Sequence, residues 1–66
     1  AGRLDRAAAA YRDAVRLDPE FAPGWFGMGL VLVRTGQKEE LPGIVERLQA
    51  LDPALGRELV RIQSGE

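Results

Sequence analysis

Few side chains in this sequence are suited to catalysis. The chain contains no His and no Cys, so the usual general base and thiol nucleophile are absent. Its lone serine, Ser64, lies near the C-terminus, and its lone threonine, Thr35, lies in a predicted turn. Glu39 and Glu40 form a carboxylate pair, but neighbours in the first turn of a helix are typical of partners of the helix dipole. We therefore expect no catalytic residue and no enzymatic activity in this chain itself.

Cofactor, metal and nucleic-acid binding are not indicated either. The stretch GWFGMG, residues 24–29, contains glycines but lacks the strand–turn–helix setting of a phosphate loop. Metal-ligand spacing is absent. Nine basic and ten acidic side chains give a net charge of -1, which argues against a nucleic acid or an anionic membrane as partner. The longest apolar run, residues 30–33, is far below the roughly 20 residues that span a bilayer.

The spacing of apolar residues by three and four predicts four helices. Thr35 and Gly36 form a turn after the second helix, and Pro42 is tolerated early in the third but delays or bends its start. Asp52 is expected to end the third helix and to cap the fourth. Three glycines in the second helix require close packing against another helix as compensation. The predicted helices cover residues 4–17, 22–34, 38–51 and 53–62.

The sequence also repeats itself after 34 residues. Leu-Asp-Pro at residues 17–19 falls on Leu-Asp-Pro at residues 51–53, and Trp25 falls on Leu59. Helices fall on helices and turns on turns. Such a period is typical of a helical repeat that buries its core by stacking on further copies of itself.

With this period the chain resembles the tetratricopeptide repeat family, whose pattern is W-x2-L-G-x2-Y, then A-x3-F, then P. The residues that carry the resemblance are Trp25, Met28 and Gly29, with Leu32 for the aromatic, then Ala7, Tyr11 and Pro19 in the first unit, and Leu41, Val45 and Pro53 in the second. The resemblance implies an all-α fold of antiparallel helical hairpins, a fragment of about four helices from a right-handed α-α superhelix.

The resemblance also implies an order of units along the chain. Residues 1–21 would hold the second helix of one repeat, residues 22–55 one complete repeat, and residues 56–66 a terminal capping helix with a frayed end. Trp25 is expected to be a core residue beside Gly29. Because the first residue is Ala1, we expect the chain to be a piece of a longer protein.

The function that the resemblance implies is non-catalytic protein–protein interaction, as a scaffold module. In this family the first helix of each repeat lines a groove that receives a peptide or a helix. The matching positions are Phe26, Leu30, Val33 and Arg34. Because three of them are apolar, the groove would suit an apolar peptide or helix. In the alternative interpretation, missing neighbours in the longer protein cover these residues.

A second surface follows from the same resemblance. Some family members grip the C-terminal carboxylate of a partner peptide, and Arg57 and Arg61 match two of the basic clamp positions. However, Gly27 stands where such a clamp requires Asn. The alternative is an ordinary solvated face, with Glu58 and Arg61 as a weak ion pair.

The alternative function is self-association. If the helix that should cover them precedes this chain, then Leu4, Ala8, Tyr11 and Val15 form an uncovered apolar stripe on the first helix. A small domain with such a stripe would gain stability as a homo-oligomer, by dimerisation or helix exchange. The sequence does not identify the partner. A cytoplasmic location is favoured, and richness in Ala, Arg, Gly and Leu favours a bacterial source.

Overall fold

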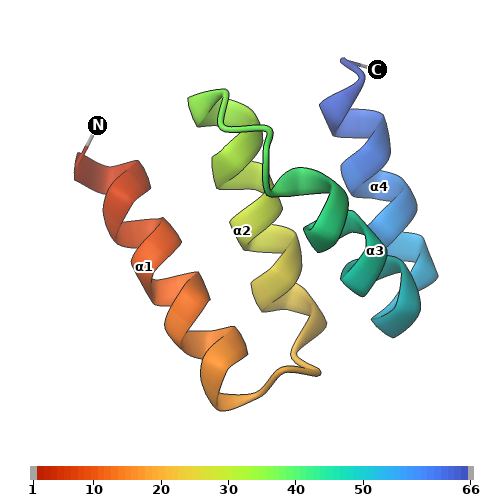
Figure 1. Cartoon of the computed structure of the whole chain (residues 1–66), viewed down its shortest axis with the longest axis horizontal. Helices are drawn as coiled ribbons and strands as arrows, with labels where there is room; N and C mark the ends of the chain where they lie inside the picture. The colour runs from red at the N-terminus through yellow and green to blue at the C-terminus, as the bar shows by residue number, and fades with distance from the viewer. Residues whose placement is uncertain (1, 66) are drawn as a thin grey trace.

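The protein was analysed as a computed structural model, which describes residues 2–65. The helices are α1 (Gly2–Leu17), α2 (Ala22–Thr35), α3 (Leu41–Leu51) and α4 (Pro53–Gln63), and the described residues contain no strand. Consecutive helices run in opposite directions (Figure 1). The structure therefore confirms the all-α fold of antiparallel helical hairpins. The boundaries proposed for the repeat units stay predictions.

The third helix begins later than the sequence suggested. Residues 39 and 40 form a bend, and α3 starts at Leu41. Pro42 has no N–H with which to continue a helix from Lys38, whose carbonyl instead accepts a 3.3 Å turn hydrogen bond from the Leu41 N–H. Glu40 is consequently the N-cap residue of α3, without a side-chain cap, and Glu39 precedes it. The expectation that both glutamates occupy the first turn was wrong.

The turn predicted after α2 and the cap predicted for α4 are both confirmed. Gly36 has a φ of 76° and lies in the left-handed region that favours glycine, and the following N–H of Gln37 donates to the Leu32 carbonyl at 3.1 Å. The Asp52 carboxylate accepts from the backbone N–H groups of Ala54 at 3.1 Å and Leu55 at 3.3 Å, so it caps α4 as predicted.

The chain continues past α4 in a turn, and the frayed end expected there stays a prediction. The Ser64 N–H donates to the Val60 carbonyl at 3.0 Å, and the Gly65 N–H donates to the Ile62 carbonyl at 3.1 Å. These two residues therefore form a hydrogen-bonded turn after α4. Glu66, the last residue of the expected frayed end, and Ala1, the first of the expected first unit, lie outside the described residues.

The core lies around α2, which packs against each of the other three helices, whereas α1 packs against α2 alone. Close approach depends on two glycines of α2. A Cβ at Gly27 would overlap the ring of Tyr11 from α1, and a Cβ at Gly29 would overlap the side chain of Leu59 from α4. This contact provides the compensation for helix propensity that the sequence required. The buried hydrophobic residues are Val15, Met28, Val31, Leu32, Leu41, Ile44, Leu48 and Leu59.

Candidate functional site

One side of α2 carries apolar side chains that the rest of the chain covers only in part. These residues are Phe26, Leu30 and Val33. Each packs against the core with part of its side chain and leaves the rest exposed. We call these three residues the α2 apolar face. Arg34 extends the same side by one more turn and is exposed. The four residues that family resemblance assigned to a groove therefore share one side of a helix.

Two neighbouring helices border the α2 apolar face. At about 100° per residue, Gly27 and Gly29 lie about 160° apart around α2 on the side that holds Phe26, Leu30, Val33 and Arg34. Tyr11 of α1 lies against Gly27, and Leu59 of α4 lies against Gly29. The face is thus a strip between α1 and α4, and the opposite side of α2 is buried toward α3 through residues such as Leu32.

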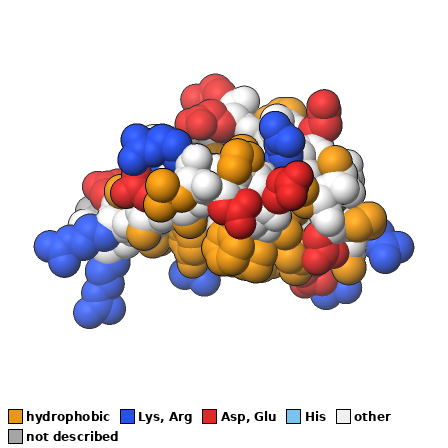
Figure 2. Space-filling view, turned by 90° about the horizontal axis from the view of Figure 1, so that it is seen from below, with side chains coloured by type: hydrophobic (Ala, Val, Ile, Leu, Met, Phe, Trp, Pro, Cys, Tyr) orange, Lys and Arg blue, Asp and Glu red, His pale blue; other side chains and the backbone are white. Residues whose placement is uncertain are grey.

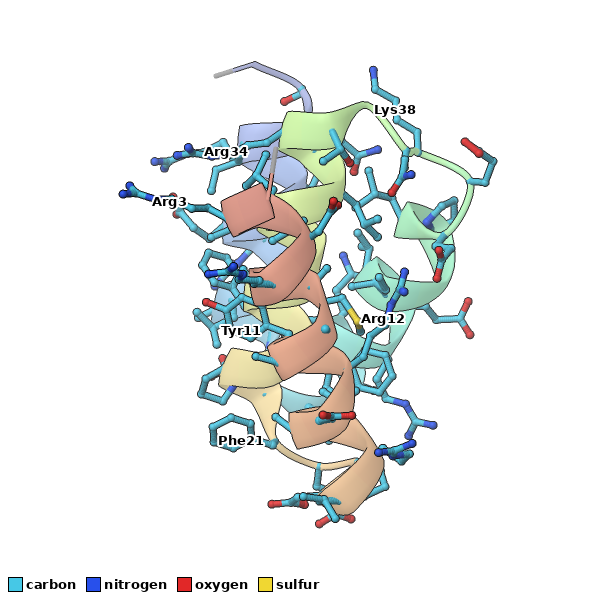
Figure 3. The ribbon with its side chains drawn as sticks, turned by 90° about the vertical axis from the view of Figure 1, so that its left-hand side faces the viewer. Arg3, Tyr11, Arg12, Phe21, Arg34 and Lys38 are labelled. Carbon is cyan, nitrogen blue, oxygen red and sulfur yellow. The ribbon has the colours of Figure 1, made fainter. Side chains whose placement is uncertain are left out.

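Other apolar side chains extend this surface. Figure 3 shows Tyr11 and Phe21 on the same side of the molecule, and Arg12 and Lys38 on the opposite side. Phe21 is 42% exposed, so it adds an accessible aromatic side chain to this side. Hydrophobic side chains also gather along the lower edge of the space-filling view (Figure 2).

The row on α1 that was expected to be uncovered faces α2 instead. Val15 is 9% exposed and belongs to the core, and the Tyr11 ring packs on Gly27. Leu4 and Ala8 are partly buried in the same stripe. The expectation that this stripe has lost its cover is therefore wrong for Val15, because a single apolar stripe on a helix reveals that a neighbour exists but not which one.

The two arginines of the fourth helix lie on its exposed side. Arg57 and Arg61 stand two residues to either side of Leu59, so each lies about 160° around the helix from the side that meets α2. Both are exposed, and Arg61 pairs with Glu58 at 3.4 Å. This arrangement agrees with the solvated-face alternative, and the role of the two arginines as a carboxylate contact stays a prediction.

Trp25 lies on the far side of α2 from this strip. Its indole N–H donates to the Pro19 carbonyl at 2.8 Å, and the Arg47 guanidinium carbon lies 5.7 Å from the ring centroid. The ring is partly buried and packs against the core. Its contacts are structural, as the sequence predicted.

Two hollows lie elsewhere on the molecule. One, of about 150 Å³, is lined by Arg12, Gln37, Glu39 and Glu40, and includes the 3.5 Å ion pair between Arg12 and Glu40. The other, of about 320 Å³, is lined by Gly43, Glu46, Arg47 and Ala50. Neither contains a residue of the α2 apolar face.

Sequence reasoning missed the placement of Arg3 and Phe21. Both extend to the side where Tyr11 and Arg34 lie (Figure 3). Arg3 lies near the start of α1 and Arg34 near the end of α2, and the antiparallel packing of the two helices puts both at the open end of the hairpin. The helical phase of Arg3 relative to Tyr11, eight residues later, was the available signal.

Residues 2–65 contain no cluster of three or more acidic, His or Cys side chains able to hold a metal ion. None of their helices combines the length and the hydropathy that crossing a bilayer requires.

Comparison with known proteins gives one match. A family model described as a TPR repeat matches residues 1–36, which is more than half of the 66-residue chain. The matched part covers α1 and α2 together with the connection between them. Comparisons with curated proteins and with solved structures found no match.

Proposed function

Because this chain belongs to the tetratricopeptide (TPR) repeat family, whose repeats generally mediate protein–protein interactions, we propose that it binds a peptide or a helix of a partner protein on the α2 apolar face. In this role the chain is a non-catalytic interaction module. The observation that carries the proposal is the partial exposure of Phe26, Leu30 and Val33 in one strip between α1 and α4.

The spacing of these residues supports a partner segment that is itself regular. Phe26 and Leu30 are four residues apart, and Val33 follows three residues later, so their side chains form a row of about two turns. Such a row matches the side chains at i, i+3 and i+4 of an amphipathic helix laid along it. Burying what remains exposed of a Phe or a Leu contributes on the order of 1 kcal/mol per side chain.

A peptide-capture experiment tests this proposal. A random peptide library displayed on phage would be selected on the immobilised 66-residue chain. We expect enriched peptides with an apolar stripe, and we expect Phe26→Glu and Leu30→Glu to abolish their capture, because each substitution places a charge where apolar side chains must meet.

The matched control is Leu17→Glu, since Leu17 is an apolar residue that is 84% exposed and stands about 160° around α1 from the buried Val15. Circular dichroism of all variants would verify that the helices remain. Capture of the same peptides by the Phe26→Glu/Leu30→Glu double variant would refute the proposal. Sedimentation at several protein concentrations would separate partner binding from self-association, the alternative function.

A further inference from the structure

Two arginines lie at the open end of the α1–α2 hairpin, the end toward which the α2 apolar face runs. Arg3 lies in the first turn of α1 and Arg34 in the last turn of α2, and both are exposed. Figure 3 shows them extending to the same side, at the end of the hairpin where α1 begins and α2 ends. Tyr11 and Phe21 lie on that side too, farther from this end.

Within the described residues, no carboxylate neutralises either arginine. The ion pairs with N···O distances up to 4.0 Å are Arg12–Glu40, Arg16–Asp13 and Arg61–Glu58, and none includes Arg3 or Arg34. Asp5, the acidic residue in the first turn of α1, stands about 160° around the helix from Arg3. The two like charges therefore remain uncompensated at this end of the strip.

The apolar row leads directly to the charged end. Phe26, Leu30 and Arg34 follow one another at intervals of four residues, so about 6 Å of helix axis separates each from the next. A partner that lies along the row thus meets two apolar side chains and then a guanidinium. Arg3, from the other helix of the hairpin, extends a second guanidinium to the same side at this end of the hairpin (Figure 3).

From this order of groups we infer that the partner segment is an amphipathic helix whose apolar stripe ends in acidic side chains, bound with its acidic end at Arg3 and Arg34. The inference rests on the proposed function of the α2 apolar face. Guanidinium groups favour carboxylates because they present paired N–H donors in a planar fork. The charges fix the direction of the bound helix, and the apolar row supplies most of the affinity.

The same phage selection, repeated on charge-reversed protein, tests the inference. From the unmodified chain we expect peptides with Asp or Glu at one end of the apolar stripe. From Arg3→Glu/Arg34→Glu we expect peptides with Lys or Arg at that position. The control is Arg12→Glu/Lys38→Glu, which has the same net charge but changes residues on the opposite side of the molecule (Figure 3), and it should keep the acidic preference.

Synthetic peptides make the result quantitative. An enriched peptide and its Glu→Lys counterpart, both labelled with fluorescein, would be titrated by anisotropy. We expect the Lys form to bind about fivefold more weakly, and the difference to shrink at high salt because the charges are exposed.

Two outcomes separate this inference from the proposed function. If enriched peptides lose capture with Leu30→Glu but show no acidic bias, the inference is wrong and the apolar face still binds. If no peptide is enriched on the unmodified chain above the Leu30→Glu variant, the proposed function fails, and the inference fails with it.

Discussion

The α1–α2 hairpin and the α3–α4 hairpin differ in the size of the side chains at equivalent positions. A shift of 34 residues places Ala7 on Leu41 and Ala14 on Leu48. Both leucines are fully buried, whereas both alanines remain partly exposed. The pattern is the same in the two hairpins, but at these two positions only the second carries large side chains.

The number of helices packed against α1 and α3 explains the difference in side-chain size. Helix α3 packs against α2 and α4, so both of its sides are covered, while α1 has α2 as its neighbour among the described helices. Only Val15 is buried on α1, compared with Leu41, Ile44 and Leu48 on α3. The stability of this chain therefore concentrates in α2, α3 and α4, and α1 depends on its contact with α2.

The largest expected effect on stability comes from truncating a buried leucine of the α3–α4 hairpin. Leu48→Ala should cost about 2–5 kcal/mol, because Leu48 is fully buried and its loss leaves a cavity. A core of this size supplies roughly 3–5 kcal/mol, so much of the protein should be unfolded at 25 °C. Urea denaturation followed by circular dichroism measures this. The equivalent position on α1 provides the contrast: Ala14→Gly should cost only about 1 kcal/mol, and equal losses would contradict the comparison.

The next effect should detach α1 alone. Gly27→Leu introduces a side chain where the Tyr11 ring lies, at a cost of about 2–3 kcal/mol. Hydrogen exchange should then accelerate across α1 while α3 and α4 keep their protection. Gly43→Leu is the control, because no atom lies within 4 Å of a Cβ at that position. Unchanged protection of α1 in Gly27→Leu would show that α1 does not depend on this contact.

A smaller effect distinguishes the two Leu-Asp-Pro sequences. Asp52→Ala removes the side-chain cap of α4 and should cost about 1 kcal/mol. Its counterpart Asp18 accepts a 3.2 Å hydrogen bond from the Glu20 N–H within the connection and caps no helix with it, so Asp18→Ala should cost only a few tenths of a kcal/mol. Urea midpoints of the two variants give the comparison. If Asp18→Ala instead destabilised the protein more than Asp52→Ala, the hydrogen bond of Asp18 would contribute more to stability than the cap of α4.

The smallest effect concerns the ion pair that links α1 to the segment before α3. Arg12 and Glu40 are 3.5 Å apart, with side chains 55% and 60% exposed. Arg12→Ala should change the free energy of unfolding by less than about 0.5 kcal/mol, because solvent screens the pair. Urea denaturation at low and high salt measures it. A loss above about 1 kcal/mol would mean that this pair, rather than the Tyr11–Gly27 contact, holds α1 in place.

Most of the fold could be predicted because its signals are local. The turn at Gly36 and the cap at Asp52 follow from backbone chemistry within a few residues, and the helices follow from apolar spacing. The start of α3 was wrong by three residues, since Pro42 delays it. That error is also local, because the missing N–H of Pro42 already indicates that the helix begins close to this residue.

The candidate site was harder to predict from the sequence than the fold. Helical phase alone groups Phe26, Leu30 and Arg34, but it does not reveal that Tyr11 and Leu59 border them. Repeat matching assigned Arg57 and Arg61 to a carboxylate contact, and this assignment stays a prediction. The sequence alone does not decide such placements, because the rotation of a helix about its axis depends on its neighbours.

The sequence by itself determined the four helices, their order and the repeat of 34 residues, since each follows from spacing and capping along the chain. Only the tertiary structure decided that the stripe on α1 faces α2, that Arg3 joins Arg34, and that Phe21 stays exposed. The physical reason is that an apolar stripe fixes which side of a helix must be covered, whereas the covering partner depends on how all four helices share their surfaces.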